Sequence, residues 1–298
     1  MTIILPADYH AQAILETNRI TCIRPEDALH QDIRPMRIGI LNIMPFGHKY
    51  EFNLLHPLGL SIIQVDPVWI KLHSHTYHST DKEHIEALYV SYEDAIKNAP
   101  LDGLIITGAP IEHIPFEEVQ YWQEVKEILL DAKHKCPSTL GICWGAFALA
   151  YLEGVDKYNY PQKLFGVFEI ENLYRYHPIT GVMDDISWCP QSRLAGLDDR
   201  LMEEAQKEGK FNLLGYGKET GYVIFETPDH RFVMHSGHPE YNSQRLVYEA
   251  ERDRGNPTVP PAANFDSDNP ANRWRGHRNQ FFGQWLKYCY TSVSLQQR

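Results

Sequence analysis

The sequence contains little cysteine and no long apolar run. No stretch approaches the roughly 18 uninterrupted apolar residues of a membrane span, and the first residues lack the basic segment and apolar segment of a secretory signal. The five cysteines among 298 residues form no CxxC pair, which argues against a zinc ribbon or a disulfide framework. We therefore expect a reduced, cytoplasmic protein that makes no contact with a membrane.

Basic residues are also scarce. Lysine and arginine number 28 against 39 aspartate and glutamate residues, giving a formal net charge of −11. Phosphate-backbone recognition requires a basic face, so this balance argues against a nucleic-acid partner. The chain has no glycine-rich phosphate loop or Walker motif, and no internal repeat. Because of these absences, we expect a small-molecule substrate rather than a nucleic-acid partner.

Short apolar runs alternate with helical segments along the chain. Strands are expected at residues 36–44, 61–70, 101–107 and 138–143, and later at 212–216, 222–226 and 232–235. Helices are expected at 116–135, 145–152, 243–254 and 281–290. The pattern predicts an α/β fold with a mostly parallel central sheet and helices on both faces, with antiparallel pairing among the later strands.

One domain with decorations is the simplest organisation that fits this pattern. It covers residues 1–298, with 1–35 as an N-terminal extension. Residues 255–272 are rich in proline, asparagine and aspartate, and we expect a long loop there. That loop and the following closing helix make up a C-terminal segment, 255–298.

The local pattern around Cys143 is typical of a nucleophile on a sharp turn. A buried strand runs directly into a helix, and Gly141 and Gly145 flank the cysteine. Such a turn exposes the side chain at the end of the sheet, beside a helix N-terminus that favours a thiolate. A buried structural cysteine is the alternative, and this motif alone does not decide between them.

A histidine and a carboxylate follow a later strand. His238 and Glu240 are two residues apart at a strand end, where the histidine can accept the thiol proton and the carboxylate can orient it. His235 is expected to belong to the strand itself. The loop at 107–112 also leaves a strand end, where ligands collect in open α/β sheets. We predict that the backbone N–H of Trp144 points at an oxyanion and that N–H groups of the 107–112 loop complete the oxyanion hole.

Three other groups of polar residues could suggest a metal. His73, His75 and His78 fit neither one helix face nor a zinc pattern. The aspartate pairs at 184–185 and 266–268 lack a full set of oxygen ligands. We expect solvated loops at all three places, and predict no metal site.

The combined motifs resemble the homoserine O-acyltransferase (homoserine transsuccinylase) family of methionine biosynthesis, which has a class I glutamine amidotransferase-like (flavodoxin-like) fold. The resemblance spans nearly the whole chain. It includes residues 33–35, 41–45, 102–110, 141–145, 163–167, 192–193, 237–241, 274–275, 277, 279 and 285.

The resemblance implies a role for each matching position. Cys143 is the acyl-accepting nucleophile, His238 the general base and Glu240 its support. Lys163 and Ser192 line the substrate site, and Arg252 holds the amino-acid carboxylate. The Ala109 amide region and Trp144 form the oxyanion hole. In this family a glutamate shortly after Gly-Ala-Pro accompanies acetyl-CoA and a glycine accompanies succinyl-CoA. The corresponding residue here is Glu112, and its charge would repel a succinyl carboxylate.

The resemblance thus implies a ping-pong O-acetyltransferase that carries an acetyl group from acetyl-CoA to L-homoserine on an acetyl-cysteine. Acetyl-CoA is a co-substrate, and no further cofactor is expected. The other partner is a small hydroxy amino acid, and a homodimer is implied.

The chain departs from the family pattern at Tyr50, Asn53, His56, Phe147 and Gln191. At 50, 53 and 56 the family has threonine, glutamine and arginine. Bulkier side chains would narrow the acceptor pocket, and a methylene is worth only about 1–3 kcal/mol in discrimination. L-serine O-acetyltransferase of cysteine biosynthesis is therefore an alternative. Homoserine O-succinyltransferase and a glutamine amidotransferase-type cysteine hydrolase are the others.

Overall fold

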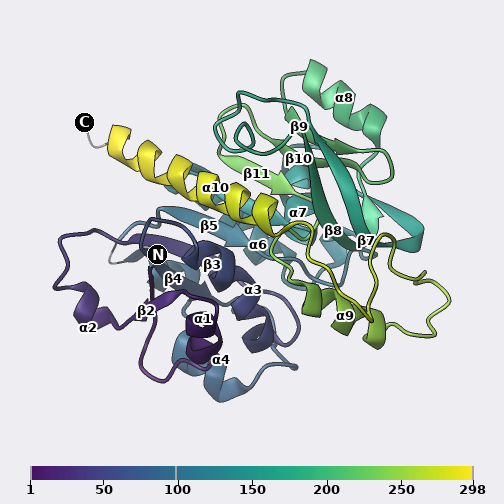
Figure 1. Cartoon of the computed structure of the whole chain (residues 1–298). Helices are drawn as coiled ribbons and strands as arrows, with labels where there is room; N and C mark the ends of the chain where they lie inside the picture. The colour runs from purple at the N-terminus through teal and green to yellow at the C-terminus, as the bar shows by residue number, and fades with distance from the viewer. Residues whose placement is uncertain (1, 98, 297–298) are drawn as a thin grey trace.

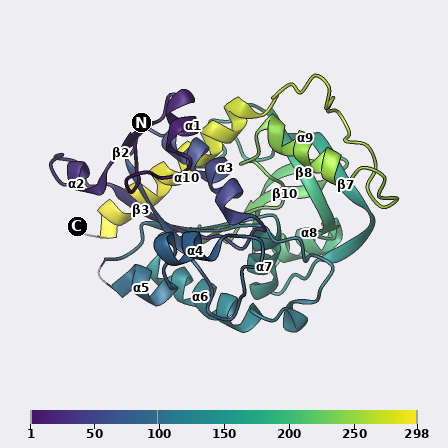
Figure 2. The ribbon, with the colours of Figure 1, turned by 90° about the horizontal axis from the view of Figure 1, so that it is seen from below.

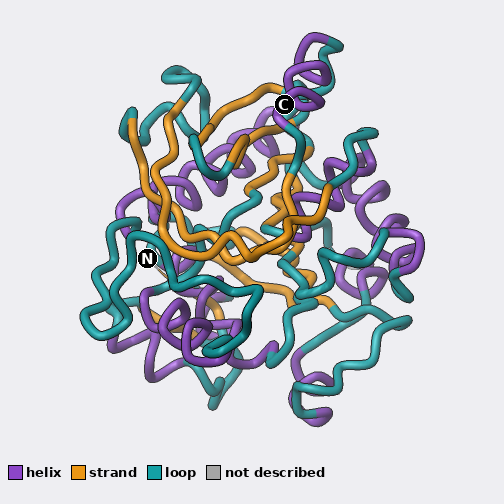
Figure 3. Tube along the Cα trace, turned by 90° about the vertical axis from the view of Figure 1, so that its right-hand side faces the viewer, coloured by secondary structure: helices purple, strands orange, loops and turns teal. Residues whose placement is uncertain are grey.

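The computed structural model describes residues 2–97 and 99–296. Residues 1, 98, 297 and 298, which the single-domain expectation includes, lie outside this description. One sheet of 11 strands runs through the molecule, in the order β2-β1-β4-β3-β5-β6-β11-β10-β9-β7-β8 (Figure 1). The sheet is a curved layer with helices to both sides (Figure 3).

The first part of the sheet is entirely parallel. Its strands are β1 (Thr2–Ile4), β2 (Thr21–Ile23), β3 (Met36–Leu41), β4 (Val65–Ile70), β5 (Gly103–Ile106) and β6 (Thr139–Ile142). Strands β3, β5 and β6 are buried at nearly every position, as expected for strands covered on both faces. Their carboxyl ends meet at one edge, so the loops that follow them lie together.

The second part is mostly antiparallel. It contains β7 (Tyr158–Asn172), β8 (Ile186–Gly196), β9 (Asn212–Gly217), β10 (Gly221–Glu226) and β11 (Phe232–His235). Strand β11 is antiparallel to β10 but parallel to β6. That single parallel pairing joins the two parts and brings the end of β11 beside the end of β6.

Helices cover both faces of the parallel part. On one face lie α1 (Gln12–Thr17), α3 (Gly47–Gly59) and α10 (Arg275–Gln296), and on the other lie α5 (Tyr92–Lys97), α6 (Trp122–Lys135) and α7 (Trp144–Leu152) (Figure 2). The remaining helices are α2 (Pro25–Ala28), α4 (Lys82–Leu88), α8 (Asp199–Lys207) and α9 (Ser243–Arg252), with a 3-10 turn at Phe116–Glu118.

The expected fold class is confirmed, and four local expectations change. The helix expected at 116–135 is interrupted, because residues 119–121 leave helical geometry between the 3-10 turn and α6. The closing helix α10 is 22 residues long rather than ten. The N-terminal extension contributes β1 and β2 to the sheet. The long hairpin β7–β8 was not expected from the sequence.

Within residues 2–97 and 99–296, no helix combines the length and the apolar character needed to cross a bilayer. All five cysteines are free thiols.

Candidate active site

Cys143 occupies a sharp, strained turn between β6 and α7. Its backbone has φ 52° and ψ −113°, a region that residues with a side chain rarely adopt. Both flanking glycines are required by close packing. A Cβ on Gly141 would lie 2.6 Å from the carbonyl oxygen of Gly145, and a Cβ on Gly145 would lie 2.5 Å from that of Ile106. The turn therefore holds the thiol at the carboxyl edge of the sheet, at the first turn of α7.

His238 lies beside this thiol, just beyond the end of β11. Its backbone N–H donates to Pro190 O at 2.8 Å, and its ring stacks on Tyr241 with centroids 4.1 Å apart. Burial lowers the pKa of His238, but the charges of Cys143 and Glu240 raise it, and the net pKa lies well above its ordinary value. The site therefore favours the imidazolium form of His238 next to the Cys143 sulfur.

Glu240 fixes the orientation of that imidazole. Its Oε1 accepts from His238 Nδ1 at 2.7 Å and from the Tyr50 hydroxyl at 2.5 Å. Glu240 is fully buried, and its Oε2 has no hydrogen-bond partner among the described residues. With Nδ1 held in this way, Nε2 is the ring atom free to exchange a proton in the pocket.

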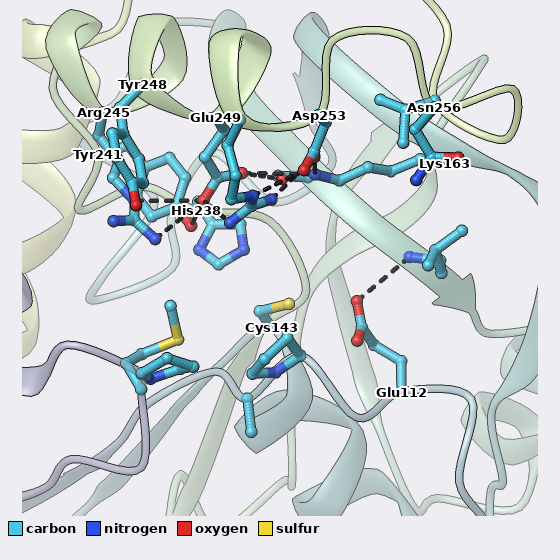
Figure 4. A pocket seen from close by; sticks show the side chains of 18 of the residues that line it. Glu112, Cys143, Lys163, His238, Tyr241, Arg245, Tyr248, Glu249, Asp253 and Asn256 are labelled. Carbon is cyan, nitrogen blue, oxygen red and sulfur yellow. Dashed lines mark hydrogen bonds and ion pairs between the residues drawn. The ribbon is translucent and has the colours of Figure 1, made fainter. Parts of the chain in front are cut away.

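Cys143 and His238 open into a cavity of about 210 Å³. Figure 4 shows the Cys143 sulfur below the His238 ring, with Lys163, Glu249 and Asp253 above them. All of these residues line the cavity, as do Ala109, Glu112, Ser192 and Arg252. The structure thus brings the predicted site residues to this cavity, except that Glu240 reaches it only through His238 and the side chain of Trp144 does not line it.

Helix α9 supplies the charged wall of the cavity. Glu249 is buried and receives hydrogen bonds from Ser192, Tyr241 and Arg245. Burial raises its pKa, but Lys163 and Arg245 lower it, and the net pKa is about 2. Glu249 therefore stays ionised and holds cationic groups around the pocket.

Two cations of this wall already have carboxylate partners. Lys163 Nζ lies 2.8 Å from Asp253 Oδ2, and Arg252 donates to the same carboxylate at 2.6 and 2.8 Å. Sequence reasoning missed Arg245 and Glu249. Glu249 lies four residues after Arg245 and three before Arg252, so the spacing that could have identified them is that of a single helix face.

Glu112 approaches the cavity from the loop after β5. It is 6% exposed, and its Oε1 accepts from the backbone N–H of Leu194 at 3.3 Å. Ala109, in the same loop, also lines the cavity. The Trp144 side chain packs away from it against Phe116 and Trp122, and its backbone N–H opens α7 next to Cys143. The oxyanion-hole assignment remains a prediction that this arrangement permits.

All five departures from the family pattern lie outside this cavity. Tyr50 is behind Glu240, Asn53 is buried in α3 and Phe147 is in the core around α7. None of the three lines the cavity. The expectation that these three side chains narrow the acceptor pocket is therefore wrong. The argument for L-serine as the acceptor gains nothing from these positions.

Two groups of histidine and glutamate come close enough to hold a metal ion. Among the described residues they are His10–Glu51–His84 and His177–Glu226–His230, and none of these six residues lines the cavity at Cys143. In the first, Tyr89 and His84 donate to Glu51 Oε1, each at 2.7 Å. In the second, His177 Nδ1 accepts backbone N–H groups, so its Nε2 carries the proton donated to Glu226. His235, as expected, belongs to β11.

Comparison with known proteins identifies the family. The sequence model described as homoserine O-succinyltransferase matches residues 2–295. A protein of Bacillus subtilis named homoserine O-acetyltransferase is 40% identical over 97% of this chain and 96% of its own length. Proteins of that name from Lachnoclostridium phytofermentans and Thermotoga neapolitana are 38% and 39% identical, over 99% and 97% of this chain and 99% and 96% of their own.

Solved structures support the fold at lower similarity. A glutamine amidotransferase from Thermotoga maritima superposes with a TM-score of 0.53 at 10% identity, covering 87% of this chain and 99% of that one. The glutaminase domain of a Trypanosoma brucei protein also gives 0.53 at 10% identity, covering 86% and 94%. The sheet is therefore of the class I glutamine amidotransferase type.

Proposed function

The chain belongs to the homoserine O-succinyltransferase family and is an acyltransferase, and from that premise we propose that it transfers an acetyl group from acetyl-CoA to the hydroxyl of L-homoserine. The observation that supports this most directly is Cys143, placed on a strained turn beside the buried His238–Glu240 pair. Full-length relatives named homoserine O-acetyltransferase support homoserine and acetyl transfer over the serine and succinyl alternatives.

The reaction proceeds in two balanced half-reactions. The Cys143 thiolate attacks the thioester carbonyl of acetyl-CoA and the bond to the CoA sulfur breaks. CoA leaves with the electron pair of that bond and takes the proton of the His238 imidazolium, so the ring is neutral for the second half-reaction. The homoserine hydroxyl then attacks the acetyl-cysteine while His238 Nε2 takes its proton. The bond to Cys143 breaks and restores the thiolate. Donors at the start of α7 stabilise the oxyanion in both steps.

The acceptor has charged groups available in the same cavity. Arg245 and Arg252 are candidates for its carboxylate, and Glu249 and Asp253 for its ammonium group. No cofactor other than the acetyl-CoA co-substrate is needed. A cytoplasmic location fits the five free thiols. A homodimer is part of the proposal, and light scattering of the purified protein tests it.

The decisive experiment follows the acetyl group. Wild type incubated with acetyl-CoA alone should gain one acetyl group on Cys143 by intact-protein mass spectrometry and peptide mapping. Added L-homoserine should remove it as O-acetylhomoserine, faster than L-serine does. Cys143→Ala should form no adduct and lose at least about 10³-fold in turnover, whereas Cys22→Ala, in strand β2, should behave as wild type. Ammonia release from glutamine without O-acetyl product would refute the proposal.

A further inference from the structure

A second cavity, of about 360 Å³, lies away from Cys143. It is enclosed by α3, the residue after α1, and the first turns of α9 and α10, which lie close to one another in Figure 2. Its lining shares no residue with the cavity at Cys143. Among the described residues, the lining contains Arg275, Arg278 and His56 but no aspartate or glutamate, although the chain carries a net charge of −11.

Arg278 is a buried cation that forms no ion pair within the described residues, although the charge of the buried Glu240 acts on it. The residue is 3% exposed. Within the described part of the chain, its guanidinium group forms no ion pair and donates one hydrogen bond, from Nε to Asn279 Oδ1 at 3.1 Å. Burial and the neighbouring Arg275 lower its pKa and the charge of Glu240 raises it, with a net pKa of about 10, so Arg278 remains charged at neutral pH. A buried charge left unpaired is destabilising, which indicates that an anion completes this site.

The other polar groups of the cavity suit the same ligand. Burial and the two arginines lower the pKa of His56 to about 4, so its ring is neutral, and its buried Nδ1 has no partner within residues 2–97 and 99–296. Amide side chains from Asn18, Asn242, Asn272 and Asn279 surround the space. The N-termini of α9 and α10 open at its wall, where helix dipoles favour negative charge.

We propose that this cavity binds a phosphate or sulfate group carried by a small molecule. Two guanidinium groups match a doubly charged oxyanion. The volume far exceeds the roughly 30 Å³ of one water in the liquid, and Phe52 and Leu60 give an apolar wall for the rest of the ligand. The anion has two chemical sources, the phosphate groups of the CoA donor or a separate phosphorylated or sulfated metabolite.

Calorimetric titration of the full-length protein with sodium sulfate and with inorganic phosphate tests the site, against sodium chloride at equal ionic strength. Arg278→Gln and Arg275→Gln should each weaken sulfate and phosphate binding at least tenfold. Arg273→Gln is the matched control, because Arg273 precedes α10, lies over Trp188 and does not line the cavity. Arg275 is exposed, so its variant keeps the test valid if Arg278→Gln fails to fold.

Comparison of CoA with 3′-dephospho-CoA distinguishes the two sources. If CoA supplies the anion, wild type should bind 3′-dephospho-CoA at least tenfold more weakly than CoA. Arg278→Gln should bind the two compounds with equal affinity. If a separate metabolite supplies it, sulfate affinity should be unchanged by saturating CoA. Equal sulfate and phosphate affinity in wild type and both cavity variants, or no binding beyond that of chloride, would overturn the site. Neither readout depends on acetyl transfer, so failure here is distinguishable from failure of the proposed reaction.

Discussion

Glu112 places a carboxylate in the cavity that contains Cys143, which is the cavity proposed to receive the acyl donor. Its carboxylate is almost fully buried, accepts one backbone hydrogen bond and lines the same cavity as Cys143. A succinyl donor would bring a second carboxylate into this poorly solvated space, where repulsion is strong. Glu112→Gly should therefore raise the ratio of kcat/KM for succinyl-CoA over acetyl-CoA by at least about tenfold, a change of about 1.4 kcal/mol.

Charge and space can be separated at this position. Glu112→Gln keeps the size of the side chain and removes its charge. If repulsion causes the discrimination, the glutamine variant should recover most of the shift. If Glu112→Gly alone accepts succinyl-CoA, the pocket excludes this donor by volume. An unchanged donor ratio in both variants would show that position 112 does not select the donor.

At this scale the sequence predicted the residues that sit in motifs. A nucleophile turn and a base at a strand end have fixed spacing in the sequence. The roles of Cys143, His238 and Glu240 could therefore be predicted from it. Tyr50 was not, because its partner Glu240 lies 190 positions away in sequence. Side-chain contacts across the sheet leave no local pattern.

The turn between β6 and α7 depends on two glycines for packing reasons. A Cβ at Gly145 would meet the backbone of β5, which cannot move aside as a flexible side chain can. Gly145→Ala should therefore lower the free energy of unfolding by about 2 kcal/mol or more. It should also displace the Cys143 thiol and lower kcat. Chemical denaturation and turnover of the same preparation measure both effects.

Helix α10 offers a matched control for that substitution. A Cβ at Gly283 would meet no described atom within 4 Å apart from the neighbouring backbone of its own helix, and Gly283 lies inside a 22-residue helix. Gly283→Ala should raise the free energy of unfolding by roughly 0.5–1 kcal/mol, because glycine is a poor helix former. A loss of stability at Gly283 equal to that at Gly145 would contradict the packing argument.

Elements with regular apolar patterns were predictable and irregular ones were not. Buried strands such as β3 and β5 are continuous apolar runs. Strand β7 is exposed over much of its first half and contains Gly166 at φ +138°, packed against the backbone of Ala263. Strand β8 buries Arg193, whose guanidinium binds Gln191, Ala195 and Thr220. These polar contacts are tertiary, so neither strand shows the period-two pattern that identifies a strand.

On the scale of the whole molecule, one buried carboxylate connects several segments of the antiparallel part of the sheet to one another. Glu226 ends β10, and its Oε1 accepts from His177 at 2.9 Å, from His230 at 2.7 Å and from Asn212 at 3.1 Å. His177 lies in the β7–β8 connection and His230 in the turn before β11. Burial raises the pKa of Glu226, but the two histidines lower it, and the net pKa is about 2.

This lowered pKa predicts the direction of acid sensitivity. A carboxyl group with a pKa of 4.5 when unfolded and about 2 when folded contributes its full stability above about pH 5. It loses that stability as the pH falls toward 2. Between pH 5 and pH 3 the free energy of unfolding of wild type should fall by about 2 kcal/mol more than that of Glu226→Gln. Denaturant titrations at the two pH values measure this difference. Glu118→Gln, at an exposed position in the 3-10 turn, is the control and should lose the same stability as wild type. If Glu226→Gln also loses as much stability as wild type between pH 5 and pH 3, Glu226 is not a source of acid lability.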